Sequence, residues 1–106
     1  MILLNPLQKE INGKEFVISR FPALAGLEIA TNYAASGFPN IKDYLSFESN
    51  VIKLMAYVGV PREGQIPLLL STRGLIDNHV SDWRMLIEIQ KEMMEYNKGF
   101  LEDALP

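Results

Sequence analysis

The sequence has no cysteine and a single histidine among its 106 residues. Without cysteine, the chain forms no disulfide framework, no thiolate zinc site and no cysteine nucleophile. A metal site would therefore depend on carboxylates, and the candidates are Glu88, Glu92 and Glu95, which lie on one face of a predicted helix. Such a run is typical of a solvated helix face, so we expect no metal and no cofactor.

Positive charge and long apolar runs are also scarce. The net charge is −3, and the lysines and arginines are scattered along the chain. Nucleic-acid-binding proteins usually carry a basic stripe, so we expect no nucleic-acid partner. No stretch approaches the roughly 20 apolar residues of a membrane helix, and no basic region precedes the apolar start of the chain. We therefore expect a cytoplasmic protein with no membrane partner, in the host cytoplasm if it is viral.

The composition is that of a globular protein, with 48% hydrophobic and 22% charged residues. The length fits one domain over residues 1–106. A core of this size is modest, and association with a partner or with a second copy would add to its stability.

The clearest local signal is the dipeptide Asn-Gly at positions 12–13, which predicts a β-hairpin with a type I′ turn. Pairing outward from this turn places Lys9 opposite Phe16 and Leu7 opposite Ile18. The apolar face would then carry Leu7, Ile11, Phe16 and Ile18. The solvent face would carry Gln8, Glu10, Glu15 and Val17.

A third strand is predicted within residues 64–72. Pro67 has no N–H to donate, so this strand is an edge strand or pairs only beyond Pro67. Before it, the segment from Gly59 to Gly64 around Pro61 predicts a turn that ends the preceding helix. Together with the helices below, these strands predict a mainly helical α+β domain with a small antiparallel sheet.

Helical periodicity covers most of the remaining sequence. Residues 23–35 follow Pro22, which suits the first turn of a helix, and Gly37 and Pro39 would end that helix. Its apolar face would carry Leu24, Leu27, Ala30 and Ala34. Asn40 would cap the next helix, whose apolar stripe is Phe47, Val51, Leu54 and Val58. Residues 73–79 predict a short helix.

The last and longest predicted helix follows Ser81, a good N-cap, and runs to about Leu101. Its apolar positions recur three and four residues apart. They are Leu86, Ile89, Met93, Tyr96 and Phe100, and the face is widened by Trp83, Ile87, Met94 and Leu101.

Methionine packs into irregular gaps in cores and is also frequent on promiscuous binding surfaces. Two interpretations of the methionines on the last helix therefore stay open: core packing, or contact with a helix of a partner or a second copy. We take Met85, Met93, Met94 and Tyr96 as candidate protein-binding residues. In that case, Met93→Asp would abolish partner binding and leave a folded domain.

The only histidine lies in Asp77-Asn78-His79-Val80-Ser81-Asp82. A Ser–His–Asp mechanism needs groups that converge from separate elements, whereas these residues are neighbours on one turn. Turn and cap roles are the favoured interpretation of these residues. We therefore expect that the protein is not an enzyme.

Three segments and one short motif resemble a known family. The segments are residues 16–26 (FVISRFPALAG), 54–58 (LMAYV) and 72–80 (TRGLIDNHV), and the motif is Met94-Glu95-Tyr96-Asn97. Over roughly residues 15–100, the chain resembles the tail assembly chaperones of tailed bacteriophages. The resemblance implies a non-enzymatic protein that coats the helical tape-measure protein before the tail tube polymerises around it. Exposed apolar stripes on a bare tape measure would aggregate, and a small helix-binding protein would shield them.

Two other roles stay open. A small, acidic, cysteine-free domain suits a phage-encoded inhibitor of a host defence enzyme equally well. A structural component of the tail or of the head–tail junction is the other role, and it would be present in purified particles.

Overall fold

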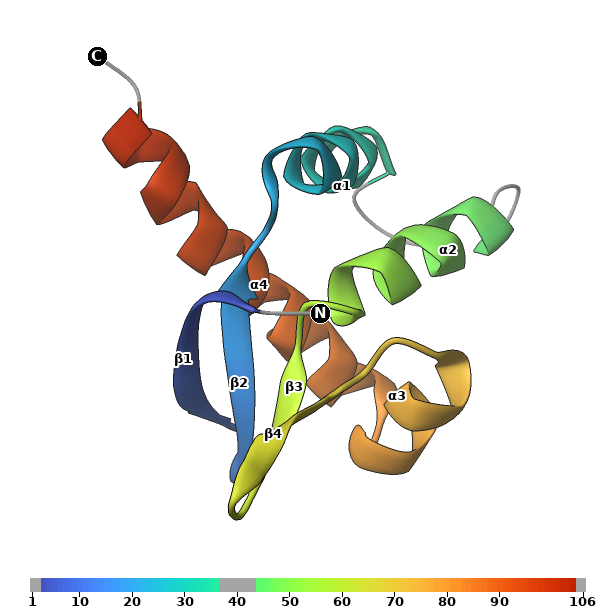
Figure 1. Ribbon diagram of the computed structural model, residues 1–106. Helices are drawn as coiled ribbons and strands as arrows, with labels where there is room; N and C mark the ends of the chain where they lie inside the picture. Colours follow the sequence, from blue (N-terminus) through green and yellow to red (C-terminus); the bar gives the residue numbers. More distant parts are fainter. Residues whose placement is uncertain (1–2, 37–43, 105–106) are drawn as a thin grey trace.

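The computed structural model describes residues 3–36 and 44–104. The described chain contains four strands and four helices, which Figure 1 labels. In chain order they are β1 (Leu4–Ile11), β2 (Lys14–Arg20), α1 (Ala23–Ser36), α2 (Tyr44–Met55), β3 (Gly59–Arg62), β4 (Gln65–Leu69), α3 (Arg73–His79) and α4 (Trp83–Ala104). The predicted α+β class is confirmed, with its N-terminal hairpin and long C-terminal helix. The helix-end signals predicted at Gly37, Pro39 and Asn40 lie outside the described residues.

The first hairpin forms as predicted. Asn12 and Gly13 have φ angles of 50° and 83°, the positive values that a two-residue hairpin turn of this kind requires. Lys9 pairs with Phe16, and Glu10 pairs with Glu15. The turn chemistry therefore sets the register of both strands.

Two side chains of this hairpin depart from the prediction. Leu7 was expected on the buried face but remains 45% exposed, because β1 is an edge strand of the sheet. Val17 was expected to face solvent but is buried. Val17 lies on the inner strand β2 and has a cross-strand partner on each side, Gln8 of β1 and Gly59 of β3, whereas Leu7 has a partner on one side alone.

A second hairpin completes the sheet, and its first strand was not predicted. The turn expected from Gly59 to Gly64 is shorter than predicted, because β3 occupies Gly59–Arg62 and pairs with both β2 and β4. A Cβ on Gly59 would lie 2.7 Å from the Cβ of Pro67, so only glycine fits there without a shift. The strand order is β1-β2-β3-β4, and the edge position predicted for the Pro67 strand is confirmed.

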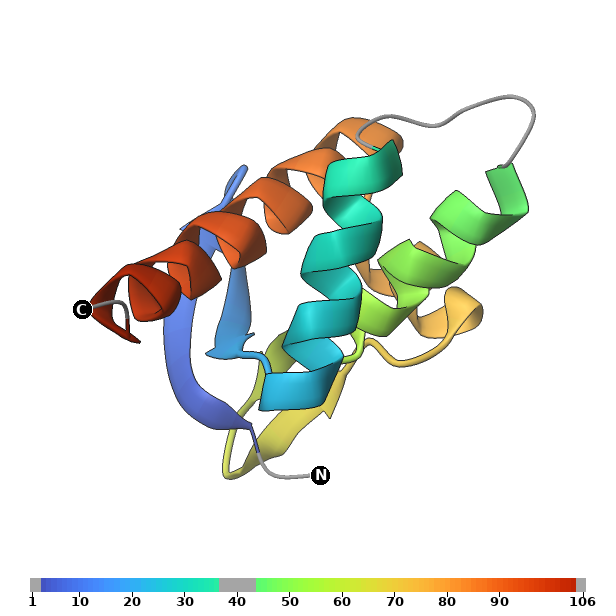
Figure 2. The ribbon, with the colours of Figure 1, turned by 90° about the horizontal axis from the view of Figure 1, so that it is seen from above.

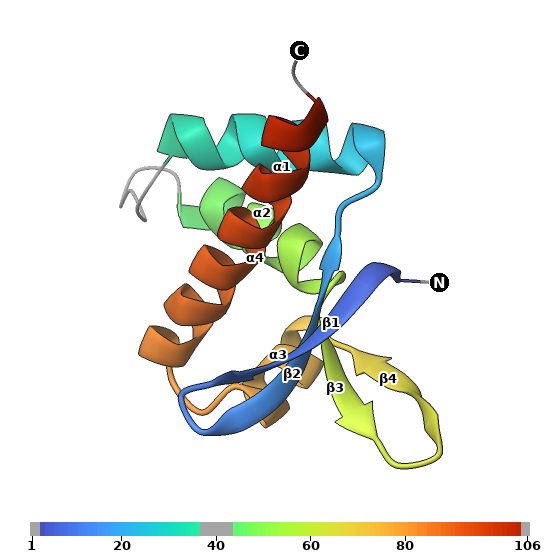
Figure 3. The same ribbon diagram turned by 90° about the vertical axis from the view of Figure 1, so that its left-hand side faces the viewer.

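The helices pack on one face and at one end of the sheet. Helix α4 crosses the face formed by β1 and β2 (Figures 1 and 3). Helix α1 lies alongside α2 (Figure 2), and α3 connects β4 to α4. The core forms where these helices meet the sheet.

Helix α2 carries the stripe that the sequence predicts. Val51 and Leu54 are buried, and Phe47 packs against the core. Val58 is also buried, but it lies beyond the helix, which ends at Met55. The core consists of Ile11, Phe16, Ile18, Phe21, Ile29, Val51, Leu54, Met55, Val58, Leu70, Ile76, Val80, Met85, Ile89 and Met93.

Candidate protein-binding site

Helix α4 carries all four residues predicted to bind a partner, and its cap fixes where it begins. The backbone N–H of Met85 donates to Oδ1 of Asp82 at 2.9 Å. Asp82 is therefore the N-cap, and the prediction of Ser81 was wrong by one residue, because the helix begins at Trp83 and the cap is the residue before it. The Ser81 hydroxyl instead donates to the sulfur of Met85 at 3.4 Å.

The four predicted binding residues lie at different depths. Met85 and Met93 are buried members of the core. Met94 and Tyr96 are half-buried and pack against its edge. Core packing, one of the two interpretations left open by the sequence, describes Met85 and Met93, whose side chains are 5% and 0% exposed.

Two polar side chains of α4, Tyr96 and Asn97, form hydrogen bonds with the N-terminal part of the chain. The Tyr96 hydroxyl donates to the carbonyl oxygen of Asn5 at 2.6 Å. Oδ1 of Asn97 accepts from the backbone N–H of Phe21 at 2.8 Å, and Nδ2 donates to the carbonyl oxygen of Ser19 at 3.1 Å. These bonds join α4 to both strands of the first hairpin and to the segment that enters α1. Asn97 lies four residues after Met93, so helical spacing places it on the same side of α4 as the core, but the sequence analysis did not identify it as a hydrogen-bonding residue.

Helix α1 shows the largest departure from the predicted packing. Leu24 is 83% exposed, Leu27 is 66% exposed, and Ala30 is also exposed. The inward side of the helix instead carries the fully buried Ile29. We call Leu24, Leu27 and Ala30 the α1 face. The segment is apolar around most of its circumference, so periodicity alone does not tell which side packs inward.

Contacts on the two flanks of the α1 face, at Gly26 and Glu28, agree with this orientation. A Cβ on Gly26 would lie 3.0 Å from the Cβ of Phe21, so the helix approaches the preceding residues closely there. Glu28 of α1 forms an ion pair with Lys53 of α2. The α1 face is therefore turned away from the rest of the domain.

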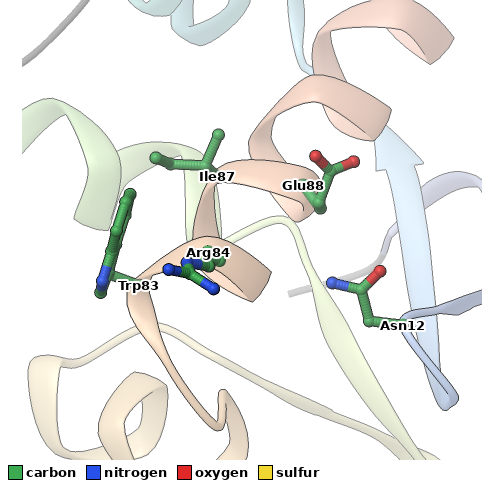
Figure 4. Close-up of a pocket in the computed structure, with 5 residues that line it drawn as sticks. All are labelled: Asn12, Trp83, Arg84, Ile87 and Glu88. Atoms are coloured by element: carbon green, nitrogen blue, oxygen red, sulfur yellow. The ribbon is translucent and has the colours of Figure 1, made fainter.

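A second exposed apolar surface lies where α4 begins, and Figure 4 shows its five lining residues. Asn12 comes from the hairpin turn, and the first two turns of α4 provide Trp83, Arg84, Ile87 and Glu88. The Trp83 side chain is 67% exposed, and the guanidinium carbon of Arg84 lies 5.5 Å from the centroid of its ring. We call this surface the tryptophan hollow. The sequence marked Trp83 and Ile87 as apolar positions but did not indicate that they lie at an open end of the helix.

Residues around the only histidine form hydrogen bonds and a helix cap. The carbonyl oxygen of His79 accepts from Nζ of Lys14 at 2.6 Å. Asp82 caps α4, and Oγ1 of Thr72 caps α3 by accepting from the N–H of Leu75 at 3.2 Å. Turn and cap roles, favoured from the sequence, account for these contacts.

Two carboxylates of the acidic run along α4, Glu88 and Glu92, form surface ion pairs. Glu92 pairs with Lys9 of β1, and Glu88 lies 3.5 Å from Nζ of Lys91. Within the described residues, no group of three or more histidine, cysteine, aspartate or glutamate side chains is placed to hold a metal ion.

Comparison of the chain with protein-family models, with curated proteins and with solved structures gives no match. In the part of the chain that the structure describes, no helix is both long and apolar enough to cross a membrane. The α1 face and the tryptophan hollow are two surfaces of the described domain where large apolar side chains are exposed on helices.

Proposed function

We propose that this domain is a non-enzymatic chaperone that binds apolar helical segments of another protein through the α1 face. The observation that carries the proposal is the exposure of Leu24 and Leu27 on one side of α1. A single exposed leucine is ordinary. Here Leu24 and Leu27 lie one helical turn apart, and Ala30 follows after another turn, so they form a continuous apolar strip.

An apolar strip on a helix is complementary to an apolar stripe on a second helix. Burying one leucine side chain contributes about 1.5–3 kcal/mol before the costs of association are subtracted. Two leucines and an alanine therefore support a modest affinity for each copy. Modest affinity suits a chaperone that an assembling structure must later displace.

The resemblance to tail assembly chaperones supplies the proposed partner, which is the long helical tape-measure protein of a tailed phage. The net charge of −3 keeps such a chaperone apart from nucleic acid in the infected cell. Relative to the sequence-based hypothesis, the binding surface moves from α4 to α1, because Met85 and Met93 lie in the core.

The test is a pull-down of the tagged full chain from cells that express the neighbouring viral genes, analysed by mass spectrometry. We expect recovery of a long helical tail protein and absence of this chain from finished particles. The double variant Leu24→Asp/Leu27→Asp should lose the tail protein while keeping a native circular dichroism spectrum. Ile66→Asp is the matched control, because Ile66 is 75% exposed on the edge strand β4, and it should retain the tail protein.

Other outcomes would overturn the proposal. Recovery of a host enzyme as the main partner would favour an inhibitor. Presence of the chain in purified particles would favour a structural component. Equal loss of the tail protein with Ile66→Asp would mean that any exposed apolar side chain suffices, and the α1 face would not be the site.

A further inference from the structure

The tryptophan hollow lies far from the α1 face. Figure 3 shows α1 across one end of the molecule, while the first turn of α4 lies toward the other end. The α1 face and the tryptophan hollow are built from different elements, so they are separate surfaces.

The aromatic wall of the hollow has the composition of a binding site. Tryptophan and arginine dominate the binding energy of protein interfaces because they combine a large apolar area with polar groups. Trp83 remains mostly exposed, so its ring contributes little to the core, and the half-buried Ile87 lies beside it on α4. A small apolar side chain placed between them would contact both.

The hollow contains one cation, Arg84, and one carboxylate, Glu88, and these two side chains form no ion pair with each other. Arg84 lies over the Trp83 ring, and no carboxylate of the described residues pairs with it. Glu88, the carboxylate of the hollow, already lies beside Lys91. Arg84 also sits in the first turn of α4, where the helix dipole disfavours a positive charge, so this charge does not stabilise the helix.

We propose that the tryptophan hollow binds a protein segment that presents an apolar side chain next to a carboxylate. The apolar side chain packs between Trp83 and Ile87, and the carboxylate pairs with Arg84. Asn12 lines the hollow from the hairpin turn (Figure 4), and its amide can hydrogen-bond to the backbone of the segment. This site is independent of the proposed function.

The test uses the single tryptophan of the chain, whose fluorescence reports on this hollow alone. The full chain is titrated with the peptide acetyl-Gly-Glu-Leu-Glu-Gly-amide and with two matched peptides that carry glutamine or lysine in place of glutamate. We expect a saturable emission change with the acidic peptide. The glutamine peptide should bind roughly two- to fivefold more weakly, and added salt should reduce the difference.

Charge-reversal variants sharpen the test. Arg84→Glu should switch the preference to the lysine peptide, and Arg84→Gln should abolish the preference between the charged peptides. Lys98→Glu is the matched control, because it changes the net charge equally at an exposed position of the same helix, and it should leave the affinity unchanged. Leu24→Asp/Leu27→Asp should also leave it unchanged, which separates this site from the α1 face.

The proposal fails if the acidic peptide leaves the emission unchanged at millimolar concentration. It also fails if the three peptides respond equally, or if Lys98→Glu weakens binding as much as Arg84→Gln does. Amide shifts in a ¹⁵N correlation spectrum provide a second readout, and they should be confined to residue 12 and residues 83–88.

Discussion

Helices α1 and α4 differ in how composition relates to burial. Helix α4 is rich in charged residues, yet Met85, Ile89 and Met93 on one side of it are buried in the core. Helix α1 has a single charged residue, Glu28, yet it leaves two leucines in solvent. An amphipathic helix reveals its packing side through periodicity, whereas an apolar helix does not. Apolar surface that the fold leaves exposed is then available for a partner.

The largest loss of unfolding free energy is expected from substitutions of Met93. Because the side chain is fully buried in the core, Met93→Asp should unfold the domain, and Met93→Ala should cost about 2–5 kcal/mol of unfolding free energy. Urea denaturation followed by far-ultraviolet circular dichroism measures both. This reverses the expectation from the sequence that the aspartate variant stays folded and loses only its partner. A folded Met93→Asp protein would restore that earlier hypothesis.

Asn97 tests whether α4 is held by specific polar contacts as well as by its apolar stripe. Asn97→Ala removes the acceptor for the Phe21 N–H and the donor to the Ser19 carbonyl, and should cost about 1–3 kcal/mol. Asn78→Ala at an exposed position of α3 is the control, and should stay within about 0.5 kcal/mol. Equal urea midpoints for the two variants would contradict the role assigned to Asn97.

A smaller loss of stability is expected at the start of α4, where it distinguishes Asp82 from Ser81 as the helix cap. Asp82→Ala removes the cap on the Met85 N–H and should cost about 1 kcal/mol. Ser81→Ala should cost less than about 0.5 kcal/mol, because its hydroxyl contacts only a sulfur atom. Thermal unfolding of the two variants compares their stabilities. A greater loss of stability for Ser81→Ala than for Asp82→Ala would make Ser81 the cap.

The smallest effect on stability is expected at the α1 face. Leu24→Ala and Leu27→Ala should each change the unfolding free energy by less than about 0.5 kcal/mol, because both side chains are mostly in water already. Ile29→Ala on the inward side of the same helix should cost about 2–5 kcal/mol. Chemical denaturation of the three variants tests the orientation of α1, which would be wrong if the leucine variants were the more destabilised.

Local signals in the sequence predict a large part of this fold. The Asn-Gly turn determines the first hairpin and its register, because few residues adopt two successive positive φ angles. Pro67 correctly predicts an edge strand. The short helix at Arg73–His79 has the predicted bounds. Each of these features depends on neighbouring residues.

The features that the sequence did not predict depend on residues far apart in the chain. Strand β3 contains Gly59 and Pro61, which indicate a turn when considered alone, and it forms a strand because Val17 lies beside Gly59. The outward orientation of Leu24 depends on how α1 packs against α2. Whether Met93 is core or interface likewise depends on the sheet that α4 covers. Periodicity identifies an apolar face but does not identify what covers it.

The bonds between α4 and the first hairpin also determine when the domain folds during synthesis. They join Tyr96 to Asn5 and Asn97 to Phe21, pairs that lie 91 and 76 positions apart. The ribosome releases the hairpin long before it has made the helix that covers it. Until α4 emerges from the exit tunnel, Phe16 and Ile18 have no apolar cover from it, and the nascent chain is prone to aggregation. Closure of the core is therefore a late event that follows translation of α4.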